Sequence, residues 1–224
     1  MRTIFTLEGP DGCGKTNHTN MLKDKFERDG ISTLVFHHNK PTNPNAYLDF
    51  FEQRKKIFTE FLNSNNKILI MDRNIYSSIV FSATFNSSLN KNNEFIVNSD
   101  SYTRLNEVKE EIEFINKIKE ETKEEIYFNT LVINCENSIL DERMNKRGEQ
   151  ITDRDYLVRN IYNNTNFSLS KLREIYEMNI IDFEYIYVNY VSQTKEEFST
   201  QIYNFLRSQI LRTEEYISYR DSFK

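Results

Sequence analysis

The sequence predicts a three-layer α/β domain, with helices on both faces of a five-stranded, mainly parallel sheet. Short apolar runs alternate with longer segments whose apolar residues recur at helical spacing. The first apolar run leads directly into a glycine-rich loop, and 224 residues suffice to bury a sizeable core. We therefore expect a single domain over residues 1–224, with a lid at 143–154.

The predicted strands are the short apolar runs. They cover residues 3–7, 32–36, 68–71, 130–135 and 185–188. Residues 68–71 read Ile-Leu-Ile-Met without alternation, which is typical of a strand buried on both faces. A sheet made of such strands, connected through helices, is expected to be parallel.

The predicted helices lie between these strands. They cover residues 15–29, 48–62, 77–85, a segment around 105–118, a short stretch from 138, a long one reaching about 177, and a closing helix from 194. Gly30 is expected to end the first helix, and Thr194 with Glu197 forms a capping box for the last. Residues 86–101 are rich in Asn and Ser, which predicts a mobile surface loop.

A phosphate-binding loop follows the first predicted strand. Its pattern, G-x-x-x-x-G-K-[ST], is formed by Gly9, Pro10, Asp11, Gly12, Cys13, Gly14, Lys15 and Thr16. In this pattern backbone N–H groups surround a phosphate, the lysine adds a mobile charge, and the Thr16 hydroxyl can ligate Mg²⁺. The loop therefore predicts ATP and Mg²⁺ binding in a P-loop NTPase fold. A glycine-rich turn without a ligand is the alternative, and the agreement of strand, loop and helix disfavours it.

A second candidate site is Asp72-Arg73, at the carboxyl end of the third predicted strand. Ligands of open α/β sheets bind beyond these strand ends, so the pair is expected beside the phosphate loop. Asp72 could hold Mg²⁺, and the planar Arg73 side chain could bind the phosphate of an acceptor. The alternative is an aspartate that caps the next turn and pairs with its neighbour.

A basic turn is predicted between two helices. It contains Arg143, Lys146, Arg147 and Arg154. Phosphoryl transfer gathers several negative charges, so a lid that carries cations could close over ATP and exclude water. A solvated helix face is the alternative reading of the same charges.

Composition limits the classes of partner. The formal net charge of −5 disfavours a kinase that acts on nucleic acid, a general nucleic-acid binder and a protein that binds anionic membranes. Positive charge for phosphate binding must therefore be confined to a small pocket. Two cysteines, Cys13 and Cys135, form no disulfide framework, and the sequence shows neither a signal peptide nor a long apolar segment. We expect a cytoplasmic protein. The heavy use of Asn, Lys, Ile and Tyr without Trp is typical of AT-rich coding, including viral coding.

Most of the chain resembles thymidylate kinases of the nucleoside monophosphate kinase group. Residues 8–16 match the motif E-G-x-D-G-x-G-K-T, and Asp72, Arg73 and Ser77 match D-R-x-x-x-S. Phe50 and Arg54 match F-x-x-x-R on the helix before the third strand. The plan of strand, helix and lid over residues 131–154 is also similar to that family.

The resemblance implies roles in binding the acceptor nucleotide. Asp11 would accept a hydrogen bond from the sugar 3′-hydroxyl, and Phe50 would stack on a pyrimidine. Arg54 would donate a hydrogen bond to a base carbonyl. An arginine donates to a carbonyl and not to an exocyclic amine, which favours thymine or uracil over cytosine. Phe81 stands where an aromatic crowds the 2′ position, which favours deoxyribose. Taken alone, Phe50 is more typical of a core residue.

Further roles follow for the helix after the third strand and for the lid. Ser77 completes the strand-end motif, and Ser78 stands where a base-contacting polar residue occurs in the family. The phosphate loop holds no arginine, so the resemblance implies that the lid supplies the catalytic cation, from Arg143 or Arg147. Three apolar residues of this helix could form either a homodimer interface or part of the core: Ile79, Val80 and Phe85.

The chain departs from the family after the second strand. Many members carry R-E-P there, and this chain has His37-His38-Asn39-Lys40-Pro41. We interpret the histidines as solvent-facing or acceptor-lining rather than as zinc ligands. The choice among thymine, uracil and a 5-modified uracil stays open.

The predicted activity is transfer of a phosphoryl group from ATP to dTMP, dUMP or a 5-modified dUMP. The acceptor phosphate is ionised near neutral pH, with a second pKa of ~6, so no strong base is required. A deoxynucleoside kinase is the alternative, but it needs a carboxylate after the second strand, where this chain offers none. A non-catalytic nucleotide sensor is the other alternative.

Overall fold

A computed structural model describes residues 1–39, 46–78, 80, 87–89, 95–97, 103–122, 125–163, 182–187 and 194–222. The elements, in chain order, are β1 (Arg2–Glu8), α1 (Lys15–Arg28), β2 (Thr33–His37), α2 (Ala46–Asn63), β3 (Ile68–Asp72), β4 (Ser87–Leu89), β5 (Phe95–Val97), α4 (Thr103–Glu121), β6 (Ile126–Asn134), α5 (Asn137–Lys146), α6 (Asp153–Asn163), β7 (Asp182–Tyr187) and α8 (Lys195–Asp221).

The main sheet has five strands in the order β2-β3-β1-β6-β7, which confirms the predicted α/β class. Every neighbouring pair in it is parallel. Leu7 of β1 lies opposite Asp72 of β3, so the strand that leads into the phosphate loop ends beside the strand that carries the acid. On its other side β1 pairs with β6, with Glu8 opposite Val132. The two predicted site segments therefore meet at one edge of the sheet.

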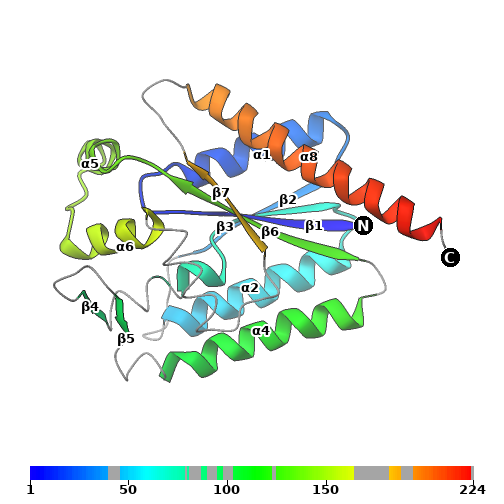
Figure 1. Cartoon of the computed structure of the whole chain (residues 1–224), viewed down its shortest axis with the longest axis horizontal. Coiled ribbons are helices and arrows are strands. Elements are labelled where there is room, and N and C mark those ends of the chain that lie inside the picture. The colour runs from blue at the N-terminus through cyan, green and yellow to red at the C-terminus, as the bar shows by residue number, and fades with distance from the viewer. Residues whose placement is uncertain are drawn as a thin grey trace.

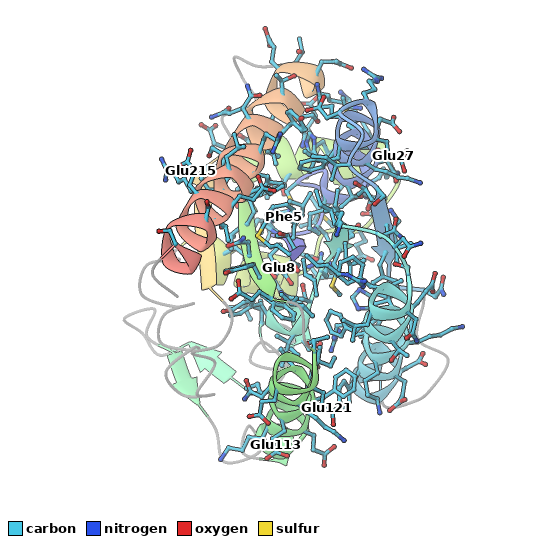
Figure 2. All side chains as sticks on the ribbon, turned by 90° about the vertical axis from the view of Figure 1, so that its right-hand side faces the viewer. Phe5, Glu8, Glu27, Glu113, Glu121 and Glu215 are labelled. Atoms are coloured by element: carbon cyan, nitrogen blue, oxygen red, sulfur yellow. The ribbon has the colours of Figure 1, made fainter. Side chains whose placement is uncertain are left out.

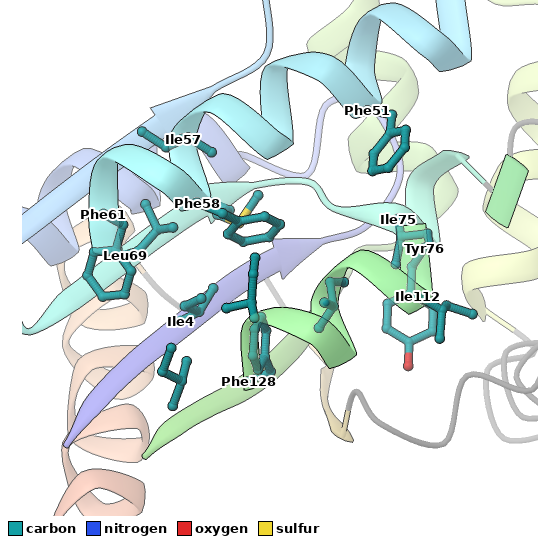
Figure 3. Packing of buried hydrophobic residues seen from close by; sticks show 14 of the residues in the cluster. Ile4, Phe51, Ile57, Phe58, Phe61, Leu69, Ile75, Tyr76, Ile112 and Phe128 are labelled. Atoms are coloured by element: carbon teal, nitrogen blue, oxygen red, sulfur yellow. The ribbon is translucent and has the colours of Figure 1, made fainter. Parts of the chain in front are cut away.

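Helices cover both faces of this sheet, as predicted. Figure 1 shows α1 and α8 over one face, α2 and α4 over the other, and α5 and α6 beyond the carboxyl ends of the strands. Among the side chains packed beneath α2 and α4 are Phe51, Phe58, Ile112 and Phe128 (Figure 3). Val80 is buried in the same cluster, so this candidate for a dimer surface belongs to the core. Its companions Ile79 and Phe85 lie outside the described residues.

The structure confirms the predicted end of the first helix at Gly30 and the predicted capping box at the start of the last. Gly30, with φ of 76°, follows the end of α1 at Arg28. At the start of α8, the Thr194 N–H donates to the Glu197 carboxylate over 2.7 Å, and the Glu197 N–H donates to the Thr194 hydroxyl over 3.2 Å. These reciprocal bonds are the predicted capping box.

Some of the predicted elements need correction. Residues 86–101 are not a loop throughout, because β4 and β5 pair there as an antiparallel hairpin. The Phe-Ile-Val sequence of β5 favours extended pairing despite the polar surroundings. The strand predicted at 130–135 begins four residues earlier, at Ile126, because the buried residues Ile126 and Phe128 continue its apolar face. The predicted helical region around 164–177 lies outside the described residues.

No helix in the described part of the chain is both long enough and apolar enough to cross a membrane.

Candidate active site

The phosphate loop connects β1 to α1 through a tight turn that requires glycine at its first position. Gly9 has φ of 144°, and a Cβ placed on it would lie 2.1 Å from the Ile133 carbonyl oxygen of β6. Gly14, the N-cap of α1, has φ of 95° in the left-handed region. The loop therefore turns tightly against the neighbouring strand, and its shape depends on residues without side chains.

Lys15 lies inside this loop. It is 6% exposed, and its ammonium group donates to the carbonyl oxygens of Gly9 (3.0 Å) and Pro10 (2.9 Å). These two backbone carbonyls thus hold the charged end of Lys15 inside the loop, where the motif is expected to bind phosphate. The Cys13 side chain is buried beneath the loop, with its sulfur 3.6 Å from the same ammonium group.

Thr16 and Asp72 come together across the two strand ends. The Thr16 hydroxyl donates to the Asp72 carboxylate over 2.5 Å, and His37 Nδ1 lies 3.3 Å from the same oxygen. Burial would raise the pKa of Asp72, but the hydrogen bond from His37 and the charge of Lys15 outweigh it and lower this pKa to about 2. A hydroxyl beside an ionised carboxylate fits Mg²⁺, which prefers oxygen ligands and takes few from protein.

Arg73 has an unusual backbone for its residue type. Its φ is 75°, and no other non-glycine residue in the described ranges has a positive φ. Its guanidinium group donates to the Gly9 carbonyl (3.1 Å) and the Ser77 hydroxyl (2.8 Å), and forms an ion pair with Asp11. The strained backbone directs this side chain across the phosphate loop, and such strain is typical of functional sites.

A buried carboxylate at the end of β1 forms hydrogen bonds with the residues that follow β3. Glu8 is fully buried and accepts hydrogen bonds from the Asn74 N–H (2.7 Å), the Ser77 hydroxyl (2.6 Å) and the Tyr162 hydroxyl (2.9 Å). Figure 2 shows Glu8 and Phe5 of the same strand, both inside the molecule. Burial first, and then the charge of Glu8, raise the pKa of Tyr162 well above its usual value. Ser77 therefore links Glu8 to Arg73.

Arg54 lies in a buried ion pair. Arg54 and Glu111 of α4 are each 1% exposed, and two guanidinium nitrogens bond the two carboxylate oxygens. The Ser78 hydroxyl accepts from Arg54 Nη2 over 3.2 Å, and His38 Nε2 accepts from Arg54 Nη1 over 3.1 Å. Phe50 is half-buried, and its ring meets the His38 ring edge-on with centroids 5.1 Å apart. Phe81 lies outside the described residues.

The basic segment at 143–154 is not a turn throughout, which corrects the prediction. Arg143 and Lys146 lie in the last turn of α5, Arg147 is its C-cap, and α6 already begins at Asp153. The segment holds neither proline nor glycine before Gly148, so the helix extends to that point. Arg143 donates to the Gly12 carbonyl over 3.0 Å, and Arg147 pairs with Glu149 at 2.9 Å.

These segments enclose a cavity of about 540 Å³. It is lined by Asp11, Gly12, Gly14, Lys15, Thr16, Asn17, His18, Asp72, Arg73, Arg143, Lys146, Arg147 and Lys195. Six of these side chains are cationic and two are carboxylates, so the cavity is positive in a chain of net charge −5. The phosphate loop, the strand-end pair and the basic segment therefore share one site.

Comparison with known proteins identifies the fold. The sequence matches no protein-family model and no curated protein. A deoxyadenosine kinase from M. mycoides with dCMP and dCDP bound is similar in structure, with 17% identity over 92% of this chain and 99% of that chain and a TM-score of 0.56. The same kinase with dATP bound has a TM-score of 0.53 and 17% identity, over 91% of this chain and 98% of that chain. Thymidylate kinase from Candida albicans has a TM-score of 0.52 and 16% identity, over 93% of this chain and 92% of that chain.

The chain shares the three-layer α/β fold of these proteins, with its phosphate loop after the first strand of a parallel sheet. Identities below one fifth establish the fold alone.

Several residues of the site carry no motif and were missed by the sequence analysis. Glu111 had a detectable signal, because it occupies the apolar stripe of α4, four residues before the buried Ile115. Tyr162 and Lys195 had none. Tyr162 reaches Glu8 across 154 residues, and Lys195 enters the cavity as the first residue of α8.

Proposed function

We propose that the protein transfers the γ-phosphoryl group of ATP to the phosphate of a deoxypyrimidine nucleoside monophosphate, either dTMP or dUMP and its 5-modified forms. One observation carries this proposal. The phosphate loop with Lys15 and the strand-end residues Asp72 and Arg73 open into the same cationic cavity. Such a site can hold a donor triphosphate and an acceptor phosphate side by side.

The donor side consists of the loop and α1. Backbone N–H groups of the loop and the Lys15 ammonium group bind the β- and γ-phosphates, so Lys15 exchanges its carbonyl partners for phosphate oxygens. Thr16 and Asp72 hold Mg²⁺, which neutralises charge on the transferred group when bound. Arg143, already anchored on Gly12, and Arg147 supply further cationic charge to the transition state.

The acceptor side begins at Arg73. Its planar guanidinium group binds the acceptor phosphate, while its partner Asp11, 51% exposed, accepts the sugar 3′-hydroxyl. The acceptor oxygen is already ionised near neutral pH, so it attacks the γ-phosphorus without a general base. The bond from the γ-phosphorus to the β,γ-bridging oxygen breaks, and ADP leaves. Further from the phosphates, and outside the residues that line the cavity, Phe50 would stack on the base and the buried Arg54 would donate to a base carbonyl. Ser78, which accepts a hydrogen bond from Arg54, and Phe81 would complete this base site.

A panel assay tests this proposal. Purified protein with ATP and Mg²⁺ is expected to release ADP with dTMP, dUMP or 5-hydroxymethyl-dUMP, and at least tenfold more slowly with dCMP, because a fixed arginine cannot accept from an amine. The Arg73→Ala variant should lose acceptor-dependent turnover by about 10²-fold or more while ATP binding persists. Thr59→Ala, on the outer side of α2, is the matched control.

Other outcomes of this assay favour the alternatives. Turnover of thymidine without turnover of any monophosphate would indicate a deoxynucleoside kinase. Tight ATP binding with no acceptor-dependent turnover would indicate a nucleotide sensor. Unchanged turnover in the Arg73→Ala variant would overturn the role given to Arg73.

A further inference from the structure

His38 follows the end of β2, and both of its ring nitrogens have a partner. Nδ1 lies 3.1 Å from the Asp72 carbonyl oxygen, and Nε2 lies 3.1 Å from Arg54 Nη1. A carbonyl oxygen can only accept, so Nδ1 carries the ring proton. A guanidinium group can only donate, so Nε2 is the unprotonated acceptor. The two contacts together determine the tautomer of the ring.

The contact with Arg54 also determines the charge state of the ring. A protonated ring would present an N–H to Arg54 in place of a lone pair, and the Arg54 contact would be lost. The observed contact of Nε2 with a guanidinium group therefore requires the neutral ring.

Arg54 is held by three partners from three different segments. Glu111 comes from α4, Ser78 from the helical turn after β3, and His38 from the end of β2. Because these segments surround the guanidinium group, its plane cannot rotate without breaking several hydrogen bonds. His38 is the partner that connects it to the backbone of the strand end, one residue before Arg73.

The same histidine ring packs against aromatic neighbours. Its centroid lies 5.1 Å from the Phe50 ring at an interplanar angle of 80°, and 4.9 Å from the Phe36 ring at 69°. Edge-to-face contacts of this kind fix the orientation of the rings. His38 thus touches both Arg54 and Phe50, the two side chains proposed to contact the base.

We propose that His38 is a positioning residue for base selection, which holds Arg54 as a rigid donor and Phe50 as a stacking surface at a fixed distance from Arg73. This inference rests on the proposed function, because it concerns the acceptor end of the same site. Without the His38 ring, Arg54 would keep Glu111 and Ser78 but lose the hydrogen bond that connects it to the strand end. A base with an amine in place of the carbonyl would then be rejected less strictly.

Two substitutions separate the functions of the two ring nitrogens. His38→Gln can place an acceptor oxygen at the position of Nε2, whereas His38→Asn can replace only the Nδ1 donor. We expect His38→Asn to lower the ratio of kcat/KM for dTMP over dCMP about tenfold, the usual effect of one hydrogen bond to a charged group. His38→Gln should keep this ratio within about threefold, and both should keep the KM for ATP within about twofold. Thr59→Ala on α2 is the control.

The ratio distinguishes positioning from a purely structural contribution. A structural loss would lower turnover of dTMP and dCMP equally and leave the ratio unchanged in His38→Asn, which would overturn the inference. The tautomer is tested without any substitution, by ¹⁵N NMR of the histidine rings in the unaltered protein. We expect a proton on His38 Nδ1, and a proton on Nε2 instead would overturn the inference even if no variant folds.

Failure of the inference can be told from failure of the proposed function. If the unaltered protein phosphorylates no nucleoside monophosphate, both are overturned. If it phosphorylates dTMP and His38→Asn retains the full preference over dCMP, the proposed function stands and only the role of His38 is rejected.

Discussion

Gly9 illustrates how one residue determines the shape of the site. A side chain at this position would meet two obstacles, a φ of 144° and the Ile133 carbonyl oxygen 2.1 Å from its Cβ. The carbonyl belongs to the backbone of β6 and cannot move aside without disturbing the sheet. The first glycine of the loop is therefore required by its backbone conformation and by packing against β6.

Substitution of Gly9 should cost much more stability than substitution of a glycine in open space. Gly9→Ala is expected to lower the free energy of unfolding by about 3 kcal/mol or more, because backbone strain and a steric clash add. Gly30→Ala is the matched control, since Gly30 has φ of 76° and a Cβ added there would have no atom within 4 Å, and it should cost only about 1 kcal/mol. Urea unfolding of both variants measures the difference, and equal costs would contradict it.

At this scale the sequence predicted the residues that lie within local motifs. Lys15, Thr16, Asp72 and Arg73 do meet in one cavity, because parallel strands bring their carboxyl ends to one edge. The pairing of Arg54 and Glu8 with their partners was not predicted, because no local motif contains both members of a pair. Arg54 pairs with a residue 57 positions away, and such contacts depend on tertiary packing.

At the scale of elements, the basic residues at the end of α5 depend on how α5 packs on α6. Arg159 of α6 is 1% exposed and pairs with Asp141 of α5 at 2.5 Å. Its second terminal nitrogen lies 3.1 Å from the Met144 sulfur, and its guanidinium group stacks 5.1 Å from the Tyr156 ring centroid. Arg159 therefore fixes the helix that carries Arg143.

Loss of this helix contact should affect both stability and turnover. Arg159→Met is expected to lower the free energy of unfolding by about 2–3 kcal/mol, because Asp141 loses its buried partner. It should also lower kcat more than ATP affinity, because Arg143 is no longer held over the loop. Lys117→Ala, which breaks an exposed pair with Glu121, should cost less than about 0.5 kcal/mol. Equal unfolding curves for the two variants would contradict the proposed role of Arg159.

Elements with strong periodicity or caps were predicted well, and irregular ones were not. The buried run of β3 and the capping box of α8 each have one local cause, so their sequences sufficed. The hairpin of β4 and β5 lies in an Asn-rich stretch, where composition indicated a loop. The helical extent of α5 was missed because a dense group of basic residues is as compatible with a solvated turn as with a helix end.

For the molecule as a whole, the distribution of charge matters more than its sum. The chain carries a net charge of −5, yet six cationic side chains and two carboxylates line the cavity. Screening limits the reach of the outer acidic surface to roughly 8 Å at physiological salt, so a nucleotide in the cavity interacts mainly with the local cations. Under the proposed function, local cations therefore let an acidic protein bind ATP and a nucleoside monophosphate at the carboxyl ends of its strands.

The most direct test of the central claim is the fate of the γ-phosphate. The protein is incubated with γ-labelled ATP, Mg²⁺ and dTMP, dUMP or 5-hydroxymethyl-dUMP, and the labelled products are separated by chromatography. We predict that with at least one of these acceptors the label appears in the nucleoside diphosphate, and that this product is lost in the Arg73→Ala variant. Label found only in inorganic phosphate or only in unreacted ATP, with all three acceptors, would contradict it.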